Sequence, residues 1–140
     1  LPGVLEHLDH AAWRKRPQEN EWALVEVICH LRDVEAEVNL KRLNVLLQGD
    51  NPFMPAADPD PWAKDRQYML QDGMQACRDF CQDRKRLLDL VTTLHDAGWQ
   101  RSARHAIFGP TTLQELVSFM AGHDRLHIRQ IFQTLQSVTP

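Results

Sequence analysis

The feature that most restricts the fold of this chain is a long amphipathic segment near its C-terminal end. The apolar residues of this segment recur at intervals of three and four, which is the spacing of one buried helix face. They are Leu113, Leu116, Val117, Met120, Ile131 and Leu135. Thr111 and Thr112 are both candidate N-caps, with Gln114 and Glu115 three residues later as capping-box partners. We therefore predict one helix over residues 109–135.

Two histidines lie on the apolar stripe of this predicted helix. His123 and His127 are one turn apart, where Leu or Ile would be expected. A single inward histidine is usually a hydrogen-bonded core residue. Two unpartnered imidazoles on one stripe are costly to bury, whereas a pair spaced this way can converge on one metal ion. The pair is half of a site, because zinc and similar ions need at least a third protein ligand.

The leading candidate for the third ligand is His30. It lies on a second predicted helix, residues 21–48, which ends at Gly49. The inward stripe of that helix is Leu24, Val27, Ile28, Leu31, Val34, Val38 and Val45. His30 falls at the border of this stripe, where a side chain can point into a pocket between helices.

Three acidic residues lie near the predicted ligands in sequence. Asp33 and Glu37 follow His30 on the same helix, and they are candidates either to orient His30 or to act as bases. Asp124 follows His123 but is turned about 100° away on the helix. We expect Asp124 to lie on the helix surface or at an interface.

A third helix is predicted over residues 69–94. Cys77 and Cys81 lie within its apolar stripe and are expected to behave as small buried hydrophobes rather than as thiolate ligands. Arg84 interrupts the same stripe. Two interpretations stay open for it: a snorkelling side chain, or a permanent cation beside a pocket that contacts a substrate anion.

The remaining segments give weaker signals. Residues 4–13 resemble the end of a helix, with His7 and His10 expected on its wet side. The proline-rich loop 49–60 is long for a compact domain, so we expect it to cover another part of the molecule. Pro61 can start a short helical turn. His105 lies in an irregular segment, residues 96–110, and the pattern leaves open whether it faces solvent or a cleft.

Composition narrows the class of protein. The 140 residues carry a net charge of −3 without a basic block, and no apolar run reaches membrane-spanning length. We expect neither a nucleic-acid partner nor a membrane partner. Three cysteines in no framework pattern favour a reducing cytoplasm. No signal peptide is visible, and the absence of an initial Met is compatible with a truncated N-terminal helix.

The helical segments together predict a single all-α domain over residues 1–140, folded as a four-helix bundle. Bundles build metal sites from side chains on facing helices. His30, His123 and His127 would leave a further coordination position open, which is typical of catalytic rather than structural sites. A divalent ion there would lower the pKa of a bound water or thiol toward neutrality.

Two stretches resemble the DinB-like (DinB/YfiT-like) superfamily of metalloenzymes. They are EWALVEVICHLRDVE (21–35) and GPTTLQELVSFMAGHDRLHIRQI (109–131), with its His-Asp-x-x-His motif. The resemblance covers nearly the whole chain. It implies an up-down-down-up four-helix bundle with a long crossover, and a metal triad at His30, His123 and His127. It also implies zinc or nickel as the metal, a homodimer, and, among characterised relatives, S-transferases and isomerases that use low-molecular-weight thiols.

These observations predict a metal-dependent enzyme that acts on a small molecule, either a hydrolase or a thiol-dependent S-transferase. The alternative is a non-catalytic stress-response or binding protein with a structural metal or a buried histidine cluster. A purely structural bundle would require His30 to lie away from the other two histidines.

Overall fold

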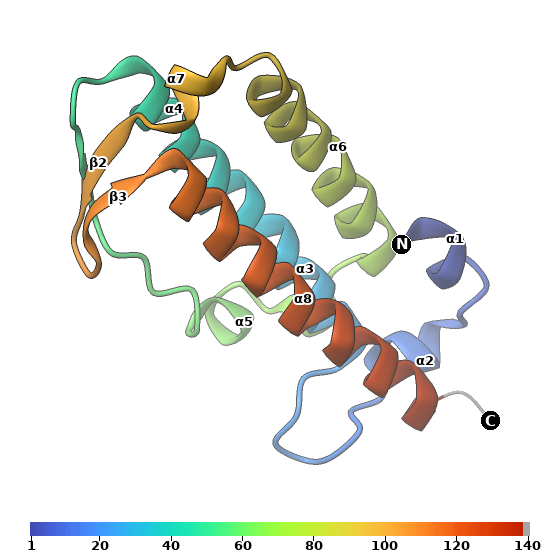
Figure 1. Ribbon diagram of the computed structural model, residues 1–140. Coiled ribbons are helices and arrows are strands. Elements are labelled where there is room, and N and C mark those ends of the chain that lie inside the picture. Colours follow the sequence, from blue (N-terminus) through green and yellow to red (C-terminus); the bar gives the residue numbers. More distant parts are fainter. Residues whose placement is uncertain (139–140) are drawn as a thin grey trace.

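Three long helices dominate the computed structural model, which describes residues 1–138 (Figure 1). The first of them is continuous along the chain and consists of α3 (Leu24–Val34), a π-helical segment η1 (Glu35–Asn39) and α4 (Leu40–Gln48). The other two are α6 (Gly73–Thr92) and α8 (Leu113–Val138). In Figure 1, α8 lies along α3 and α4, with α6 beside them. The second predicted helix is confirmed, although it begins at Leu24 rather than at residue 21.

Short elements connect the long helices. They are α1 (Pro2–Leu5), α2 (His10–Arg14), α5 (Trp62–Asp65), the 3-10 helix η2 (Tyr68–Leu70) and α7 (Asp96–Trp99). The single helix predicted over residues 4–13 is therefore wrong. Asp9 is extended and accepts a hydrogen bond from the Ala12 backbone N–H at 2.7 Å, so it caps a new helix instead of continuing one.

A three-stranded sheet closes one end of the helices. Its strands are β1 (Phe53–Met54), β2 (Ser102–His105) and β3 (Gly109–Thr112), in the order β1-β2-β3. β1 pairs with β2 in parallel, and β2 pairs with β3 as an antiparallel hairpin. The sheet corrects the all-α prediction: the protein is mostly helical, but not strictly so. Strands of two to four residues are too short for a period-2 pattern to register in the sequence.

The start of α8 shows why the predicted helix was too long. Thr112 and Glu115 form the expected capping box: Thr112 N–H donates to Glu115 Oε2 at 2.8 Å, and Glu115 N–H donates to Thr112 Oγ1 at 3.2 Å. Residues 109–112 pair with β2 instead of entering the helix. The helix therefore begins at Leu113.

The π-helical segment displaces the buried stripe of the second helix. Val45 was predicted to be buried, but it is 43% exposed, whereas Leu43 and Leu46 are buried. One extra residue in a π turn moves every later residue round the helix axis. The stripe that reaches Val38 therefore continues at Leu46, one position later than a strict α-helical period predicts.

A polar layer divides the core into two apolar halves. One half contains Trp13, Leu24, Ile28, Tyr68, Cys77 and Ile131. The other half lies toward the sheet and contains Leu43, Leu46, Met54, Leu87, Leu113 and Leu116. Between them along α8 lie His123, Asp124 and His127, and Arg84 occupies the corresponding place on α6. The candidate ligands thus belong to a polar level in the middle of the molecule.

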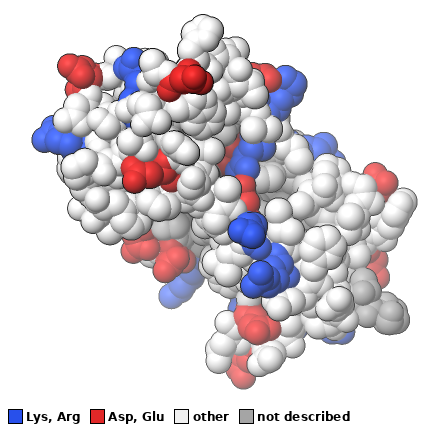
Figure 2. Space-filling model, viewed as in Figure 1, with Lys and Arg blue, Asp and Glu red and all other residues white. Residues whose placement is uncertain are grey.

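The surface gives few further signals. Charged side chains of both signs are interspersed on the face drawn in Figure 2. Within residues 1–138, no helix is both long enough and apolar enough to span a bilayer.

Two helical glycines provide a matched pair for a stability test. A Cβ on Gly73 would lie 2.3 Å from two ring atoms of Trp13, whereas a Cβ on Gly122 would meet nothing within 4 Å. We expect Gly73→Ala to destabilise the protein by about 1–3 kcal/mol through crowding, although alanine favours helix. Gly122→Ala should instead stabilise it by roughly 0.5–1 kcal/mol. Urea unfolding of both variants measures the difference, and a gain in stability for Gly73→Ala would contradict this account.

Candidate metal centre

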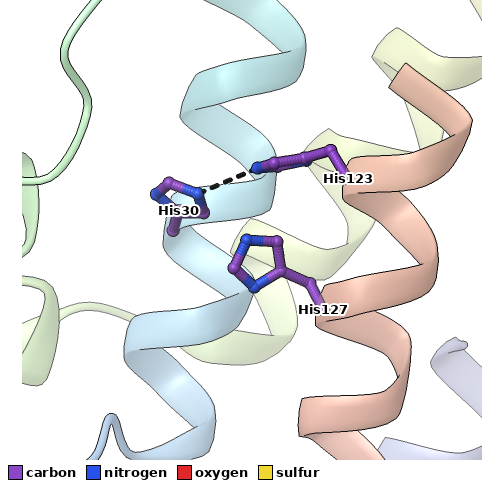
Figure 3. Close-up of side chains that lie close together, drawn as sticks. All are labelled: His30, His123 and His127. Carbon is purple, nitrogen blue, oxygen red and sulfur yellow. Dashed lines mark hydrogen bonds between the residues drawn. The ribbon is translucent and has the colours of Figure 1, made fainter. Parts of the chain in front are cut away.

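Three histidines from two helices converge in the polar layer. His30 projects from α3, and His123 and His127 project from adjacent turns of α8 (Figure 3). The local reason is the one that the sequence indicated: both α8 histidines occupy the face that carries Met120 and Ile131 toward the core. The arrangement excludes a bundle in which His30 lies apart from the other two.

The separations between ring nitrogens match those of a metal site. His30 Nε2 and His123 Nε2 are 3.2 Å apart, and one potential ligand atom from each of the three rings lies within 4.8 Å of the others. Tetrahedral zinc with nitrogen ligands at about 2.0–2.1 Å places neighbouring nitrogens about 3.3 Å apart. The His30–His123 separation already matches this value, and the three side chains together could hold a divalent ion.

The histidines are held in the neutral form that metals require. His30 and His127 are 3% and 8% exposed, and His123 is partly buried. Burial, reinforced by the neighbouring His127 and His123, lowers the pKa of His30 to about 3. Burial also lowers the pKa of His123 and of His127. At neutral pH the cluster therefore presents unprotonated nitrogens.

Two side chains that the sequence analysis did not single out orient the cluster. Gln130 Oε1 lies 2.8 Å from His127 Nδ1 and accepts a hydrogen bond from its N–H, which leaves His127 Nε2 free as a ligand. The Trp22 ring stacks on the His127 ring, with 6.4 Å between the ring centroids and 9° between the ring planes. Its centroid lies 5.0 Å from that of the His30 ring. The spacing of Gln130, three residues after His127 on the same helix, was the signal that could have identified it.

Other ring nitrogens of the cluster are left unsatisfied by the protein. The Nδ1 atoms of His30 and His123 are buried and have no hydrogen-bond partner in the part of the chain that the structure describes. A metal ion bound through Nε2 would leave these two Nδ1 atoms without a protein partner as well.

Asp33 and Glu37 are directed toward a different partner from the one predicted. Asp33 accepts hydrogen bonds from Arg32, Arg66 and the Tyr68 hydroxyl, each at 2.7 Å. Glu37 also binds Arg66, at 2.5 Å. None of these bonds involves His30, although the charge of Asp33 is close enough to raise the pKa of His30 slightly against burial. Their roles as orienting groups or bases stay predictions.

Arg84 is held by two carboxylates. Its Nε and Nη2 donate two hydrogen bonds to the two carboxylate oxygens of Glu35, at 2.7 and 2.8 Å. Its guanidinium also donates to both oxygens of Asp124. A substrate anion would have to compete with both carboxylates for Arg84. The predicted contact between Arg84 and a substrate anion therefore stays a prediction. Asp124 was expected on the helix surface or at an interface. Its side chain is 14% exposed and ion-paired with Arg84 of α6, so it lies at the interface between α8 and α6.

Two cavities reach the cluster from different sides. A polar one of about 560 Å³ is lined by Trp22, His127, Gln130 and Thr134 among others. A smaller one of about 190 Å³ is lined by His123 and by Ala57 and Pro59 of the long loop. The loop predicted to cover something therefore forms one wall of a cavity beside the histidines.

The other candidate residues lie away from the cluster. His7 and His10 are exposed, as expected, and the three cysteines are free, with Cys77 fully buried. The sequence left undecided whether His105 faces solvent or a cleft. In the structure His105 is 4% exposed and lies on the inner face of β2. Within residues 1–138, the three histidines are the group whose geometry suits a metal ion.

The contact between Gln130 and His127 predicts a measurable effect on metal affinity. Gln130→Ala removes the acceptor that fixes the His127 ring, so we expect the affinity for zinc to fall about 10- to 100-fold. Gln133→Ala is the matched control, because Gln133 lines the same cavity on the same helix. Competition titration with a chromophoric chelator measures both. Equal affinities in the two variants would remove Gln130 from the account of the site.

Comparison with known proteins identifies the family and the fold of this chain. The protein YuaE of Bacillus subtilis, which is uncharacterised, is 21% identical over 150 aligned positions that cover 96% of this chain and 90% of YuaE. The solved structure of YfiT from the same organism superposes with a TM-score of 0.84 at 18% identity, covering 96% of this chain and 77% of YfiT. YfiT is described as a probable metal-dependent hydrolase with an unusual four-helix bundle topology. The family model of the DinB superfamily matches residues 1–131, and the chain therefore belongs to the DinB superfamily.

Proposed function

We propose that this protein is a metal-dependent hydrolase whose divalent ion is held by His30, His123 and His127. The observation that carries the proposal is the convergence of three neutral imidazoles from two helices, with two of their nitrogens 3.2 Å apart. The fold shared with YfiT supports it. Three protein ligands leave one coordination position for water or substrate.

The chain's own residues supply the setting for this chemistry. A divalent ion bound here would supply Lewis acidity, which polarises a carbonyl group and makes water more acidic. Gln130 keeps the His127 ring in one tautomer, and Trp22 covers one side of the histidines. The two cavities give water and a small substrate separate approaches to the cluster.

Zinc and nickel are the metals that we propose. Both bind imidazole well, and the all-nitrogen ligand set argues against magnesium and calcium, which prefer oxygen. Thiol-dependent transfer is the second candidate reaction suggested by the family. It would use the same open position for a thiolate in place of water, and it predicts consumption of an electrophile only when a thiol is added.

We further propose the up-down-down-up helix order of the family and a homodimer. Ile128 and Phe132 support the dimer, because they lie one turn apart on α8 and are 40% and 52% exposed. Sedimentation should show a dimer that Phe132→Lys converts to a monomer, with Leu70→Lys, at an exposed apolar site on η2, as the control. A monomeric wild type at micromolar concentration would remove this proposal.

The central test measures metal content and hydrolysis together. Wild-type protein purified without an affinity tag should carry close to one zinc or nickel per chain and should hydrolyse members of a panel of small esters and amides. His127→Ala should lose the metal and at least about 100-fold in rate. His7→Ala, at an exposed histidine, should change neither. Metal without turnover on water or thiol panels would favour a structural or binding role, and absence of metal after reconstitution would overturn the proposal.

A further inference from the structure

The smaller cavity beside His123 has a lining that is mostly apolar but not wholly so. Val34, Val38, Leu116 and Met120 contribute apolar surface from the two helices that carry the histidines. The polar side chains in the same lining are His123, Asn39 and Arg42. A cavity of about 190 Å³ with an apolar body and a few polar groups is a typical small-molecule site in miniature.

Arg42 stands in this lining without a carboxylate partner. The residue is half-buried, and its guanidinium donates an exposed hydrogen bond to the Pro55 carbonyl oxygen at 3.2 Å. No Asp or Glu of residues 1–138 forms an ion pair with it. Burial lowers the pKa of Arg42. Arg66 and Arg84, by contrast, each hold two carboxylates.

His105 lies near Arg42 but does not line the cavity, and its ring has a buried donor without an acceptor within residues 1–138. His105 Nδ1 accepts hydrogen bonds from the backbone N–H groups of Ile107 and Phe108, at 3.1 and 3.4 Å. The proton of the neutral ring is therefore on Nε2, which is buried and has no partner within residues 1–138. His105 pairs in the sheet with Met54, the residue before Pro55, and the charge of Arg42 adds to burial in lowering the pKa of His105.

Arg42 is the cation in the lining of this cavity, and it has no carboxylate partner within residues 1–138. A carboxylate satisfies a guanidinium through two parallel hydrogen bonds. The apolar walls between Arg42 and the histidine cluster suit a hydrocarbon chain rather than an inorganic anion.

We infer that this cavity binds a small organic carboxylate, with the carboxylate on Arg42 and an apolar chain directed along α3, η1 and α8 toward His123. The inference names a substrate class for the hydrolase proposed above and rests on that proposal. It also gives Arg42 the anion contact that Arg84, already paired with Glu35 and Asp124, is poorly placed to make.

The test uses an unreactive pair of probes of similar shape. Hexanoate carries the carboxylate, and hexanamide lacks the charge. Isothermal titration calorimetry on wild-type protein of measured metal content should show hexanoate binding at least about tenfold more tightly than hexanamide. Arg42→Gln should abolish this preference, and Arg42→Lys should retain part of it. Arg104→Gln is the matched control, because Arg104 is exposed on β2.

A hexanoate that binds Arg42→Gln as tightly as wild type would overturn the inference, since the carboxylate would then reside on the histidines or on their metal. The same titration on metal-free His127→Ala separates the two proposals. A preference for hexanoate that persists there and depends on Arg42 supports the anion site even if no hydrolysis is found. Metal-dependent hydrolysis that is equally fast for neutral and anionic esters, and indifferent to Arg42→Gln, supports the hydrolase and overturns the anion site.

Discussion

The ion pairs of Arg84 join the three long helices at one level. Arg84 on α6 binds Glu35, which is fully buried in η1, and Asp124, which precedes the middle of α8. Asn39 adds a hydrogen bond to Glu35 at 2.8 Å. Removing one member of such a network leaves a buried charge without compensation, which costs several kcal/mol. The network thereby fixes the level at which α3 and α8 face each other, and with it the separation between His30 and the α8 histidines.

The same polar level explains why the metal centre and the candidate substrate cavity adjoin. The apolar halves above and below it pack as ordinary core and need no ligand. Between them, the π-helical segment widens one turn of the long helix and carries Val38 and Asn39 into the cavity wall. π-Helical turns interrupt the regular ladder of hydrogen bonds and are frequent at functional sites. Here the widened turn lies between His30 and Arg42, so it sets their relative positions.

The site also depends on segments outside the long helices. Ala57 and Pro59, which follow β1, line the cavity beside His123, and the sheet places His105 between Met54 and Gly109. Arg66, which follows α5, engages Asp33 and Glu37 and so ties the loop's far end to the helix that bears His30. Two acidic residues predicted near the metal therefore anchor the covering loop as well.

The sequence by itself determined the three long helices and the inward positions of His123 and His127, because both follow from local periodicity. A stripe at spacing three and four records which residues face inward, and His123 and His127 occupy that stripe whatever packs against it. The tertiary structure alone decided what lies opposite each side chain. Four features depend on contacts between residues far apart in the chain. They are the shift of the buried stripe from Val45 to Leu46, the sheet at the bundle end, the pairing of Arg84 with Glu35 and Asp124, and the absence of an ion pair at Arg42 within residues 1–138. Local periodicity carries no record of such contacts, since a charged residue on a helix has the same spacing whether its partner is a carboxylate, water or a substrate.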